Sequence, residues 1–389
     1  MKGRRAITVT REGWYYLFIL AFVVGGAVMR QINPLFALSG LMVAPLLLNW
    51  RIAAVQLRSM RVDRRLPPRI AAGESLAVDL SIRNDRSGLD TWQLRVIERI
   101  RWIGEKRSRE DRVEVLVPIV AADHEVDTSY RTVLLRRGRY RFEPPIIGSA
   151  FPFGLIAASR RLDGDDQLLV SPRVGRLGPA WRRAVRADRT GAQGASYRRG
   201  AADGDFYSLR EYRRGDPIRS IHWRSSAKLG ELMVRQVEQR SDRQVALLVD
   251  LWIPETFDDQ DLDAVELAAS FAATAVVDLC RNAGGKLTLS IGAAETFHHS
   301  GSPSPALRNT VLDFLATAKA SAESEPFSMW LEAGAGGGGG STTTALVIST
   351  RPAEELTKLV EGLPEYVARI PRIGVRDPGI GDWFRLAAD

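Results

Sequence analysis

The stretch from Gly204 to Gln236, GDFYSLREYRRGDPIRSIHWRSSAKLGELMVRQ, determines how the rest of the chain is interpreted. It combines two Gly-Asp pairs, many arginines and a His-Trp pair. It is too polar for a hydrophobic core and too rich in aromatic residues for a flexible linker. Runs typical of strands precede it, and strand-like and helix-like runs alternate after it, so it lies between two differently built regions.

The composition sets limits on the fold and on the chemistry. A chain of 389 residues is long enough for several domains, and its formal net charge of +8 favours an anionic partner, either nucleic acid, a membrane surface or an acidic protein. The single cysteine, Cys280, excludes an intrachain disulfide and a thiolate metal cluster. It lies in an apolar helical run, so we expect it to be a small core residue.

Residues 1–55 are predicted to form a transmembrane helical hairpin. Two uncharged runs, Trp14–Met29 and Pro34–Trp50, are each nearly long enough to cross a bilayer, and aromatic residues stand at their outer ends. The second run, and the lack of an A-x-A cleavage site, argue against a signal peptide. Basic residues flank the hairpin, whereas the turn holds only Arg30. The positive-inside rule then predicts a multi-pass inner (cytoplasmic) membrane protein with both termini and the soluble domains in the cytoplasm.

Residues 56–172 show the two-residue alternation of β-strands, which predicts an antiparallel β-sandwich acting as a spacer or interaction domain. We expect a hairpin turn at 136–140. The expected strands are SLAVDLSIR (75–83), TWQLRVIERI (91–100), RVEVLVPIV (112–120), DTSYRTVLL (127–135), GRYRFEPPIIGSAF (138–151) and DDQLLVSP (165–172).

The arginine-rich segment, residues 173–243, leaves three interpretations open. Its arginines form a solvated or internally paired surface, or dock an acidic protein partner, or contact nucleic acid or anionic lipid. The absence of a recognisable nucleic-acid-binding motif makes nucleic acid the weakest of these.

Local patterns in the same segment predict specific contacts. Asp216, in the turn Gly215-Asp216-Pro217, can accept hydrogen bonds from nearby backbone amides, and Pro217 can open a helix. Arg210 and Arg213 are suited to bidentate pairing with Asp205 or Asp216. Arg219, Trp223 and Ala227 recur at helical spacing and would share a face, with Trp223 as a packing anchor.

Residues 244–389 alternate between strand and helix patterns, which predicts an α/β domain with a parallel sheet and helices on both faces. Ligands of such sheets bind at the carboxyl ends of the strands, where Asp250 and Ser349-Thr350 stand. The glycine-rich run 334–340 is expected to be a flexible loop without a phosphate-binding motif, and His298-His299 to lie at an exposed hairpin tip. Expected strands are 244–251, 286–293, 345–350 and 367–375, and expected helices are 262–281, 306–320 and 353–363.

The segment also resembles a known family. The matching pattern is Gly204-Asp205-Phe206, Arg210, Tyr212, Gly215-Asp216, Arg219, Ile221, Trp223, Ala227 and Gly230-Glu231-Leu232, and it is similar to the signature of the bacterial DUF58 proteins. This resemblance implies a membrane-anchored protein with a C-terminal von Willebrand factor A-like (Rossmann-like) domain. It also implies a MoxR-type AAA+ ATPase as the protein partner.

In von Willebrand A domains an Asp-x-Ser-x-Ser motif holds Mg²⁺ through oxygen ligands. Here Asp250 is followed by Trp252 and Pro254 where the serines would stand, so we expect no metal or other cofactor. A weaker site made by Asp250, Asp258, Asp259 and Thr350 is the alternative. Otherwise Asp250 would cap a local turn, or form a salt bridge with an arginine of the signature segment.

These observations favour a non-enzymatic, membrane-anchored scaffold that binds a protein partner through its cytoplasmic A-like domain. A hydrolase centred on His222, Asp216 and Asp250 is one alternative, and binding of anionic lipid or nucleic acid by the arginine-rich segment is another. The residues expected to form the partner-binding or signature site are Gly204, Asp205, Phe206, Arg210, Tyr212, Gly215, Asp216, Arg219, His222, Trp223 and Gly230.

Overall fold

The computed structural model describes residues 5–104, 110–186, 205–213, 216, 218–238, 244–282, 285–324, 343–360 and 370–386. The chain divides into two compact units, Met1–Ser171 and Pro172–Asp389. Each is described by itself.

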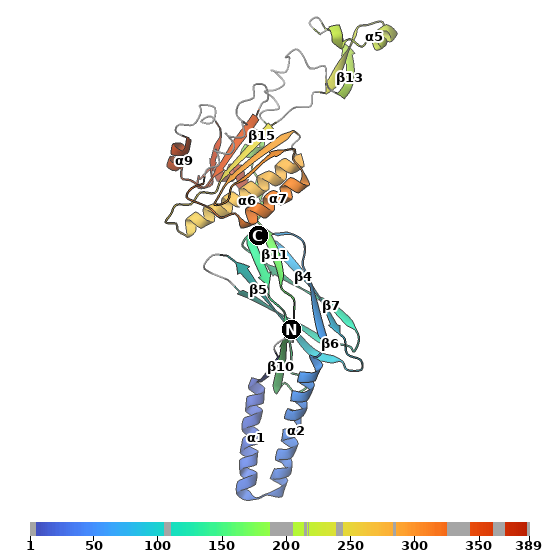
Figure 1. The fold of residues 1–389 in the computed structure, drawn as a ribbon, viewed down its shortest axis with the longest axis vertical. Coiled ribbons are helices and arrows are strands. Elements are labelled where there is room, and N and C mark those ends of the chain that lie inside the picture. Colours follow the sequence, from blue (N-terminus) through green and yellow to red (C-terminus); the bar gives the residue numbers. More distant parts are fainter. Residues whose placement is uncertain are drawn as a thin grey trace. The chain divides into compact units, whose positions relative to one another are not determined.

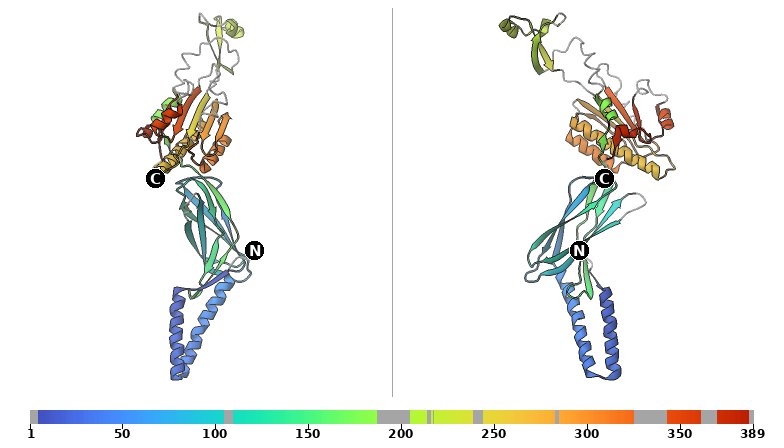
Figure 2. Two further views of the ribbon diagram at one scale, coloured as in Figure 1. Left: turned by 60° about the vertical axis from the view of Figure 1, so that its left-hand side comes forward. Right: turned by 180° about the vertical axis from the view of Figure 1, so that it is seen from behind.

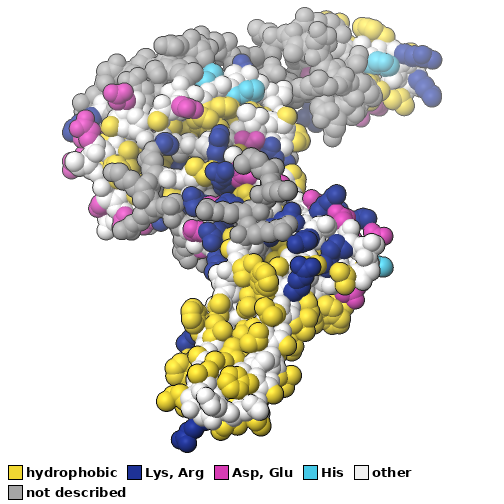
Figure 3. Space-filling view, turned by 60° about the horizontal axis from the view of Figure 1, so that its bottom comes forward, with side chains coloured by type: hydrophobic (Ala, Val, Ile, Leu, Met, Phe, Trp, Pro, Cys, Tyr) yellow, Lys and Arg dark blue, Asp and Glu magenta, His cyan; other side chains and the backbone are white. Residues whose placement is uncertain are grey.

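The first unit begins with two long antiparallel helices, α1 (Arg11–Arg30) and α2 (Asn33–Gln56), joined by a tight turn (Figures 1 and 2). Both are long and apolar enough to cross a membrane, and only 11% of the most apolar 18-residue stretch of each helix is buried. Their surface is largely hydrophobic (Figure 3). The prediction of two apolar N-terminal helices is confirmed.

Both ends of this hairpin are built into strands of the same unit. β1 (Arg5–Val9), which the sequence pattern did not predict, leads directly into α1 and pairs with β10 (Ile156–Arg161). α2 runs into β2 (Met60–Arg65). Gly13 lets the first turn of α1 approach the loop before β10, because a Cβ there would lie 2.0 Å from the Leu155 carbonyl oxygen.

The strands of the first unit form two sheets. A three-stranded antiparallel sheet has the order β2-β4-β7, with β4 at Ser75–Asn84 and β7 at Glu125–Val133. A larger, eight-stranded sheet has the order β1-β10-β9-β5-β8-β11-β3, and β6 also pairs with β5. Its pairs are antiparallel except for β11 with β3. Its remaining strands are β3 (Ile70–Ala71), β5 (Thr91–Ile103), β6 (Glu110–Val120), β8 (Gly138–Phe142), β9 (Ile146–Ser149) and β11 (Asp166–Ser171).

One hydrophobic core joins these two sheets. Leu76, Val78 and Leu80 of β4 and Leu94 and Val96 of β5 belong to the same buried cluster. The alternation of buried and exposed residues along β4 is the period of two that predicted it. The hairpin turn expected at 136–140 is wrong, because β7 and β8 belong to different sheets and the chain passes between the sheets there.

A buried charge network also links the two sheets. Arg64 of β2 forms two parallel hydrogen bonds to Glu98 of β5, at 2.8 and 2.9 Å, and a 2.6 Å hydrogen bond to Asp166 of β11. The Tyr130 hydroxyl of β7 donates to the same Glu98 carboxylate at 3.0 Å. Burial, and then the charge of Glu98, raise the pKa of Tyr130 well above its usual value, so the phenol stays protonated as a donor.

The second unit contains a five-stranded sheet with the order β17-β16-β15-β18-β19. β15 pairs in parallel with β16 and β18, and β19 continues the parallel set, whereas β17 is antiparallel. The predicted alternation of strands and helices is confirmed, with shifts of a few residues at the ends. The bounds are β15 Gln244–Asp250, α6 Asp259–Asn282, β16 Lys286–Gly292, β17 Phe297–Gly301, α7 Pro305–Thr317, β18 Thr343–Ser349, α9 Ala353–Val360 and β19 Arg372–Gly374.

The core of this unit lies between the sheet and its helices. Trp181 of α3 (Pro179–Arg186) is fully buried edge-on against Phe271 of α6, and Phe271 stacks on Phe384 of β20 (Phe384–Arg385). β20 pairs with β12 (Arg176–Leu177) and follows α11 (Ile380–Trp383). Cys280 packs half-buried against this core, as expected.

The histidine pair of this unit lies within a strand. His298 and His299 are not at a hairpin tip but lie half-buried within β17, because the turn precedes Phe297 and the histidines pair with Ser290 and Leu289 of β16. The glycine-rich run 334–340 lies outside the described residues.

Candidate functional site

The signature segment folds as a two-stranded hairpin that carries a short helix. β13 (Asp205–Glu211) pairs antiparallel with β14 (Met233–Glu238). Between them come a 3-10 turn, η1 (Ile218–Ser220), and α5 (Trp223–Leu229). Figure 1 shows α5 beside β13. The Tyr212 amide closes the hairpin with a 2.7 Å hydrogen bond to the Leu232 carbonyl. We call residues 205–238 the signature hairpin.

Arg210 and Asp216 form the electrostatic centre of the signature hairpin. The guanidinium donates two parallel hydrogen bonds to the carboxylate, at 2.6 and 2.7 Å, and the Arg213 amide donates a third at 2.8 Å. The predicted bidentate pair and the predicted backbone contact of Asp216 are therefore confirmed. The hydrogen bonds from Arg210, followed by that from the Arg213 amide, lower the pKa of Asp216 to about 2, so Asp216 stays ionised.

His222 acts as the N-cap of α5. Its Nδ1 lies 2.9 Å from the Ser225 hydroxyl and accepts from the Ser225 amide at 3.3 Å. Gly230 ends the helix in the left-handed conformation at φ 75°, and its amide donates to the Ser226 carbonyl at 2.9 Å. His222 and Gly230 thus fix the two ends of α5 within the signature hairpin.

Trp223 is not the packing anchor that the sequence suggested. Its side chain is 62% exposed, whereas Ile221 and Val234 are the buried apolar residues here. The expectation of a face shared with Arg219 is also wrong, because α5 begins at Trp223 and Arg219 belongs to η1.

Large apolar side chains next to Trp223 in the sequence are exposed as well. They are Ile218, Leu229 and Leu232. Among the basic side chains of α5, Arg224 and Lys228 are exposed, and no ion pair is recorded for either among the described residues. The short helix therefore presents aromatic, aliphatic and cationic groups together.

A second polar cluster stands at the carboxyl end of the five-stranded sheet. Asp250 ends β15 and lies directly beside Ser349, which ends β18. The chain leaves β15 towards β16 on one side and returns to β18 on the other, so this edge is the topological switch point of the sheet. The predicted meeting of Asp250, Ser349 and Thr350 at this edge is confirmed.

The Asp250 carboxylate is fully buried and accepts hydrogen bonds from three side chains. Ser324 donates to Oδ1 at 2.6 Å, and Ser349 and Arg351 donate to Oδ2 at 2.7 and 2.9 Å. The Arg351 guanidinium also donates to the Ser324 carbonyl at 2.8 Å and stacks over the Trp252 ring at 5.1 Å. The predicted salt bridge of Asp250 with an arginine is therefore present, but the arginine is Arg351 at the sheet edge. The prediction that it would come from the signature segment is wrong.

The weaker metal site is not assembled. The Thr350 hydroxyl donates to the Trp252 carbonyl at 2.5 Å, away from the carboxylate. At the start of α6, the backbone amides of Asp258 and Asp261 each donate to the carboxylate of the other. Within the described residues, no three His, Cys, Asp or Glu side chains gather as metal ligands. Arg351 supplies the positive charge beside Asp250.

The three residues of the hydrolase alternative each have other partners. Asp216 binds Arg210, His222 binds Ser225, and Asp250 binds Ser324, Ser349 and Arg351. No contact among the three is recorded in the part of the chain that the structure describes.

Gly204 and Gly215 lie outside the described residues, and so do the side chains of Asp205, Phe206 and Arg219. Conversely, sequence reasoning missed Arg351 and Ser324. Arg351 follows directly after Ser349-Thr350, so an arginine beside the carboxyl end of a strand was the available signal. Ser324 had none.

Comparisons with known proteins agree with the signature. Residues 208–328 match the family model described as "Protein of unknown function DUF58". The "Uncharacterized protein YeaD" of Bacillus subtilis is 23% identical over 233 residues, which cover 60% of this chain and 56% of that protein. This chain therefore spans little more than half of that relative.

Likenesses to solved structures are weak. They include a beta-glucosidase from Listeria innocua, at 15% identity and TM-score 0.20 over 28% of this chain and 16% of that one. A CARDB domain from Pyrococcus furiosus matches at 11% identity and TM-score 0.18, over 28% of this chain and 93% of that one. Scores this low carry no argument about the fold. The family match over residues 208–328 agrees with the signature pattern, which is similar to that of the DUF58 proteins.

Proposed function

We propose that this protein is a non-enzymatic, membrane-anchored scaffold that binds a protein partner through its cytoplasmic part. The observation that carries the proposal is the exposure of Trp223, Ile218 and Leu229 in the signature hairpin, close in sequence to the exposed Arg224 and Lys228. Trp and Arg are the residue types that dominate binding energy at protein interfaces. Single exposed apolar residues are ordinary, but four within residues 218–232 are better explained by a partner.

The resemblance stated above suggests a MoxR-type AAA+ ATPase as that partner. The basic character of α5 fits an acidic surface on it, because complementary charge speeds encounter and fixes orientation. The paired Arg210 and Asp216 keep the hairpin in one shape, so the exposed side chains are presented before binding.

The membrane hairpin is the proposed anchor, with α1 and α2 as two spans. β1 and β2 extend from opposite ends of the hairpin into one folded unit, which supports placing both ends on the same side of the membrane. Basic residues at these ends favour the cytoplasmic side, and the bacterial family favours the inner membrane.

The remaining regions have proposed roles that follow from their sheets. Residues 56–172 would be a β-sandwich spacer, supported by the single core that two sheets share. Residues 244–389 would be a von Willebrand A-like domain, supported by the parallel sheet and by Asp250 at the end of its first strand. Arg351 occupies the cation's role there, so we propose no metal cofactor.

The test is capture of the partner by the full chain. Detergent-solubilised protein is incubated, with and without ATP, with a MoxR-type AAA+ ATPase from the same genome. We expect retention in the wild type and a loss of about thirty-fold or more in affinity for the double variant Trp223→Ala and Leu229→Ala.

A matched control is Phe257→Ala, which removes another exposed aromatic side chain of the second unit and should leave binding unchanged. Failure to retain the ATPase in either nucleotide condition would overturn the choice of partner. Equal loss in the double variant and the control would overturn the assignment of the surface.

A further inference from the structure

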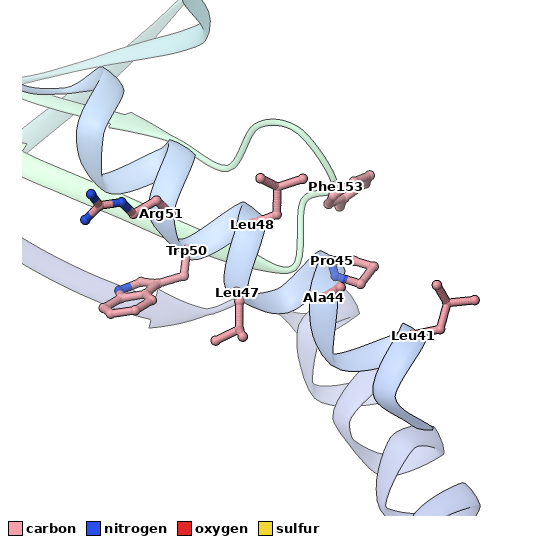
Figure 4. Close-up of a pocket in the computed structure, with 8 residues that line it drawn as sticks. All are labelled: Leu41, Ala44, Pro45, Leu47, Leu48, Trp50, Arg51 and Phe153. Atoms are coloured by element: carbon pink, nitrogen blue, oxygen red, sulfur yellow. The ribbon is translucent and has the colours of Figure 1, made fainter. Parts of the chain in front are cut away.

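Two adjoining hollows lie along α2 where the hairpin meets the strands. The first is an apolar groove of about 770 Å³ lined by Leu41, Ala44, Leu48 and Phe153 and ending at Trp50 and Arg51 (Figure 4). The second, of about 230 Å³, shares Trp50 and Arg51 with the first and adds Arg58 and Arg160. The two hollows thus meet at Trp50 and Arg51, and three arginines are among the residues that line the second.

The sequence of α2 places this change of character on one face of the helix. Leu41, Ala44, Leu48 and Arg51 follow one another at intervals of three or four residues, which brings them into line. Arg58 continues the line, because its amide bonds to the Val55 carbonyl at 3.0 Å just after the helix ends. The face is hydrocarbon-like over Leu41–Leu48 and cationic beyond it.

The opposite wall is held in place by a buried polar residue. Asn49 of α2 is fully buried, and its side-chain amide donates to the Ala150 and Phe151 carbonyls at 3.1 and 3.0 Å. Its carbonyl oxygen accepts from the Leu155 and Ile156 amides at 2.8 and 3.0 Å. These bonds fix the 150–156 loop against the helix, so that Phe153, half exposed, stands beside Leu48 (Figure 4).

The arginines of the second hollow have no carboxylate partner among the described residues. Arg160 donates to the Leu57 carbonyl at 3.2 Å, but no ion pair of Arg51, Arg58 or Arg160 with a carboxylate is recorded among the described residues. No acidic side chain lines either hollow. Three cations that share one pocket repel each other, so an anion bound there would be stabilised.

The geometry points to a binding site for an anionic phospholipid. One acyl chain would lie in the apolar groove between α2 and Phe153, and the phosphate of the headgroup would contact Arg51, Arg58 and Arg160. Trp50 stands at the boundary, the depth at which aromatic side chains favour the membrane interface. This site rests on the proposed membrane anchorage, and it lies in the first unit, apart from the arginine-rich segment 173–243.

The test measures lipid binding to the full chain in detergent by native mass spectrometry. We expect dioleoyl phosphatidylglycerol to be retained in preference to dioleoyl phosphatidylcholine. The double variant Arg51→Gln and Arg58→Gln should bind phosphatidylglycerol about thirty-fold more weakly, since each arginine near an anionic lipid surface contributes several-fold. Phe153→Ala should weaken both lipids alike, because it removes only the wall of the groove.

The matched control is Arg30→Gln, which removes an exposed arginine at the far end of the same hairpin and should change nothing. Glycerol phosphate, a headgroup without chains, should fail to compete; effective competition would assign the pocket to a free phosphate compound and overturn the lipid site. Equal retention of the two lipids, or an unaffected double variant, would also overturn it. Carbonate extraction of cell membranes tests the proposed anchorage separately from the lipid site. If the protein resists extraction but shows no lipid preference, the anchorage stands and only the lipid site is overturned.

Discussion

Arg351 donates a charge-assisted hydrogen bond of 2.9 Å from its Nε to Oδ2 of Asp250. Asp250 ends β15, and Arg351 lies just beyond the end of the adjacent parallel strand, β18. The carboxylate is fully buried and the guanidinium nearly so. A fixed side-chain cation therefore balances the charge at the switch point of the sheet, which makes the charge balance there independent of solution conditions that would load or strip a metal.

Removing this cation should destabilise the second unit. Arg351→Met leaves Asp250 buried beside two hydroxyl donors without a positive partner, and we expect a loss of about 3–5 kcal/mol in the free energy of unfolding. Denaturant unfolding of the full chain in detergent measures it, with hydrogen exchange of β15 to localise the change. Arg376→Met, which breaks the more exposed pair with Asp261, is the control and should cost less. Adding Asp250→Asn to Arg351→Met should recover part of the loss, and a further loss would contradict the account.

The buried pair in the first unit should behave in the same way. Glu98→Gln leaves the buried Arg64 with the partly exposed Asp166 as its carboxylate partner, so we expect a loss of about 3–5 kcal/mol in the free energy of unfolding. The matched control is Glu114→Gln, whose partner Arg95 lies 3.7 Å away with both side chains exposed, and it should cost less than about 1 kcal/mol. Similar losses for both variants would show that the network does not join the sheets.

The ionisation of Asp216 should depend on Arg210. The folded pKa of about 2 is below the ordinary 3.8, so this contact stabilises the signature hairpin above about pH 4 and the contribution is lost as the pH falls from about 4 towards 2. Arg210→Gln should raise the pKa of Asp216 towards 3.8, measured by NMR titration of ¹³C-labelled aspartate in the full chain. Asp261, whose pKa is lowered by the Asp258 amide and by Arg376, is an internal reference that should not move.

Two tryptophans should differ sharply in their effect on stability. Trp181→Ala opens a cavity beside Phe271 and should cost about 3–5 kcal/mol. Trp223→Ala removes an exposed side chain and should change stability by no more than about 0.5 kcal/mol. Thermal unfolding of both variants gives the comparison. A large loss for Trp223→Ala would restore its role as a packing residue.

The proposed membrane topology predicts where a reagent can reach. In a Cys280→Ser background, Asn33→Cys at the hairpin turn should react with a membrane-impermeant maleimide added to intact cells, once the outer permeability barrier is opened. Ser87→Cys, exposed in the loop after β4, should react only after the inner membrane is disrupted. The reverse pattern would place the soluble domains outside the cytoplasm.

Local periodicity was enough to predict most elements. The two-residue alternation of 75–83 identified β4, and the alternation of apolar strands with amphipathic runs identified β15, α6, β16 and α7, because each pattern reflects one buried face. The Arg210 and Asp216 contact was predictable as well, since both residues lie within one short turn-containing segment.

Contacts between distant segments were not predictable in this way. The pairing of Arg64 with Glu98, the closure of Asp250 by Ser324, and β1 against β10 depend on sheet order, which a single sequence does not encode locally. Trp223 was misjudged because helical spacing describes which residues share a face but not whether anything covers that face. Asn49 is the opposite case, because this polar residue in an apolar run is buried and bonds to the loop 150–156.

The two ends of the hairpin are attached to different sheets, β1 to the eight-stranded sheet and β2 to the three-stranded one. If one helix slides or tilts against the other in the bilayer, the displacement must shear the core between the sheets and strain the Arg64 and Glu98 bridge. A force applied to the strands would likewise reach the hairpin through both β1 and β2. In the proposed membrane-anchored protein, attachment at two points would restrict rotation of the hairpin relative to the strands more than a single span would.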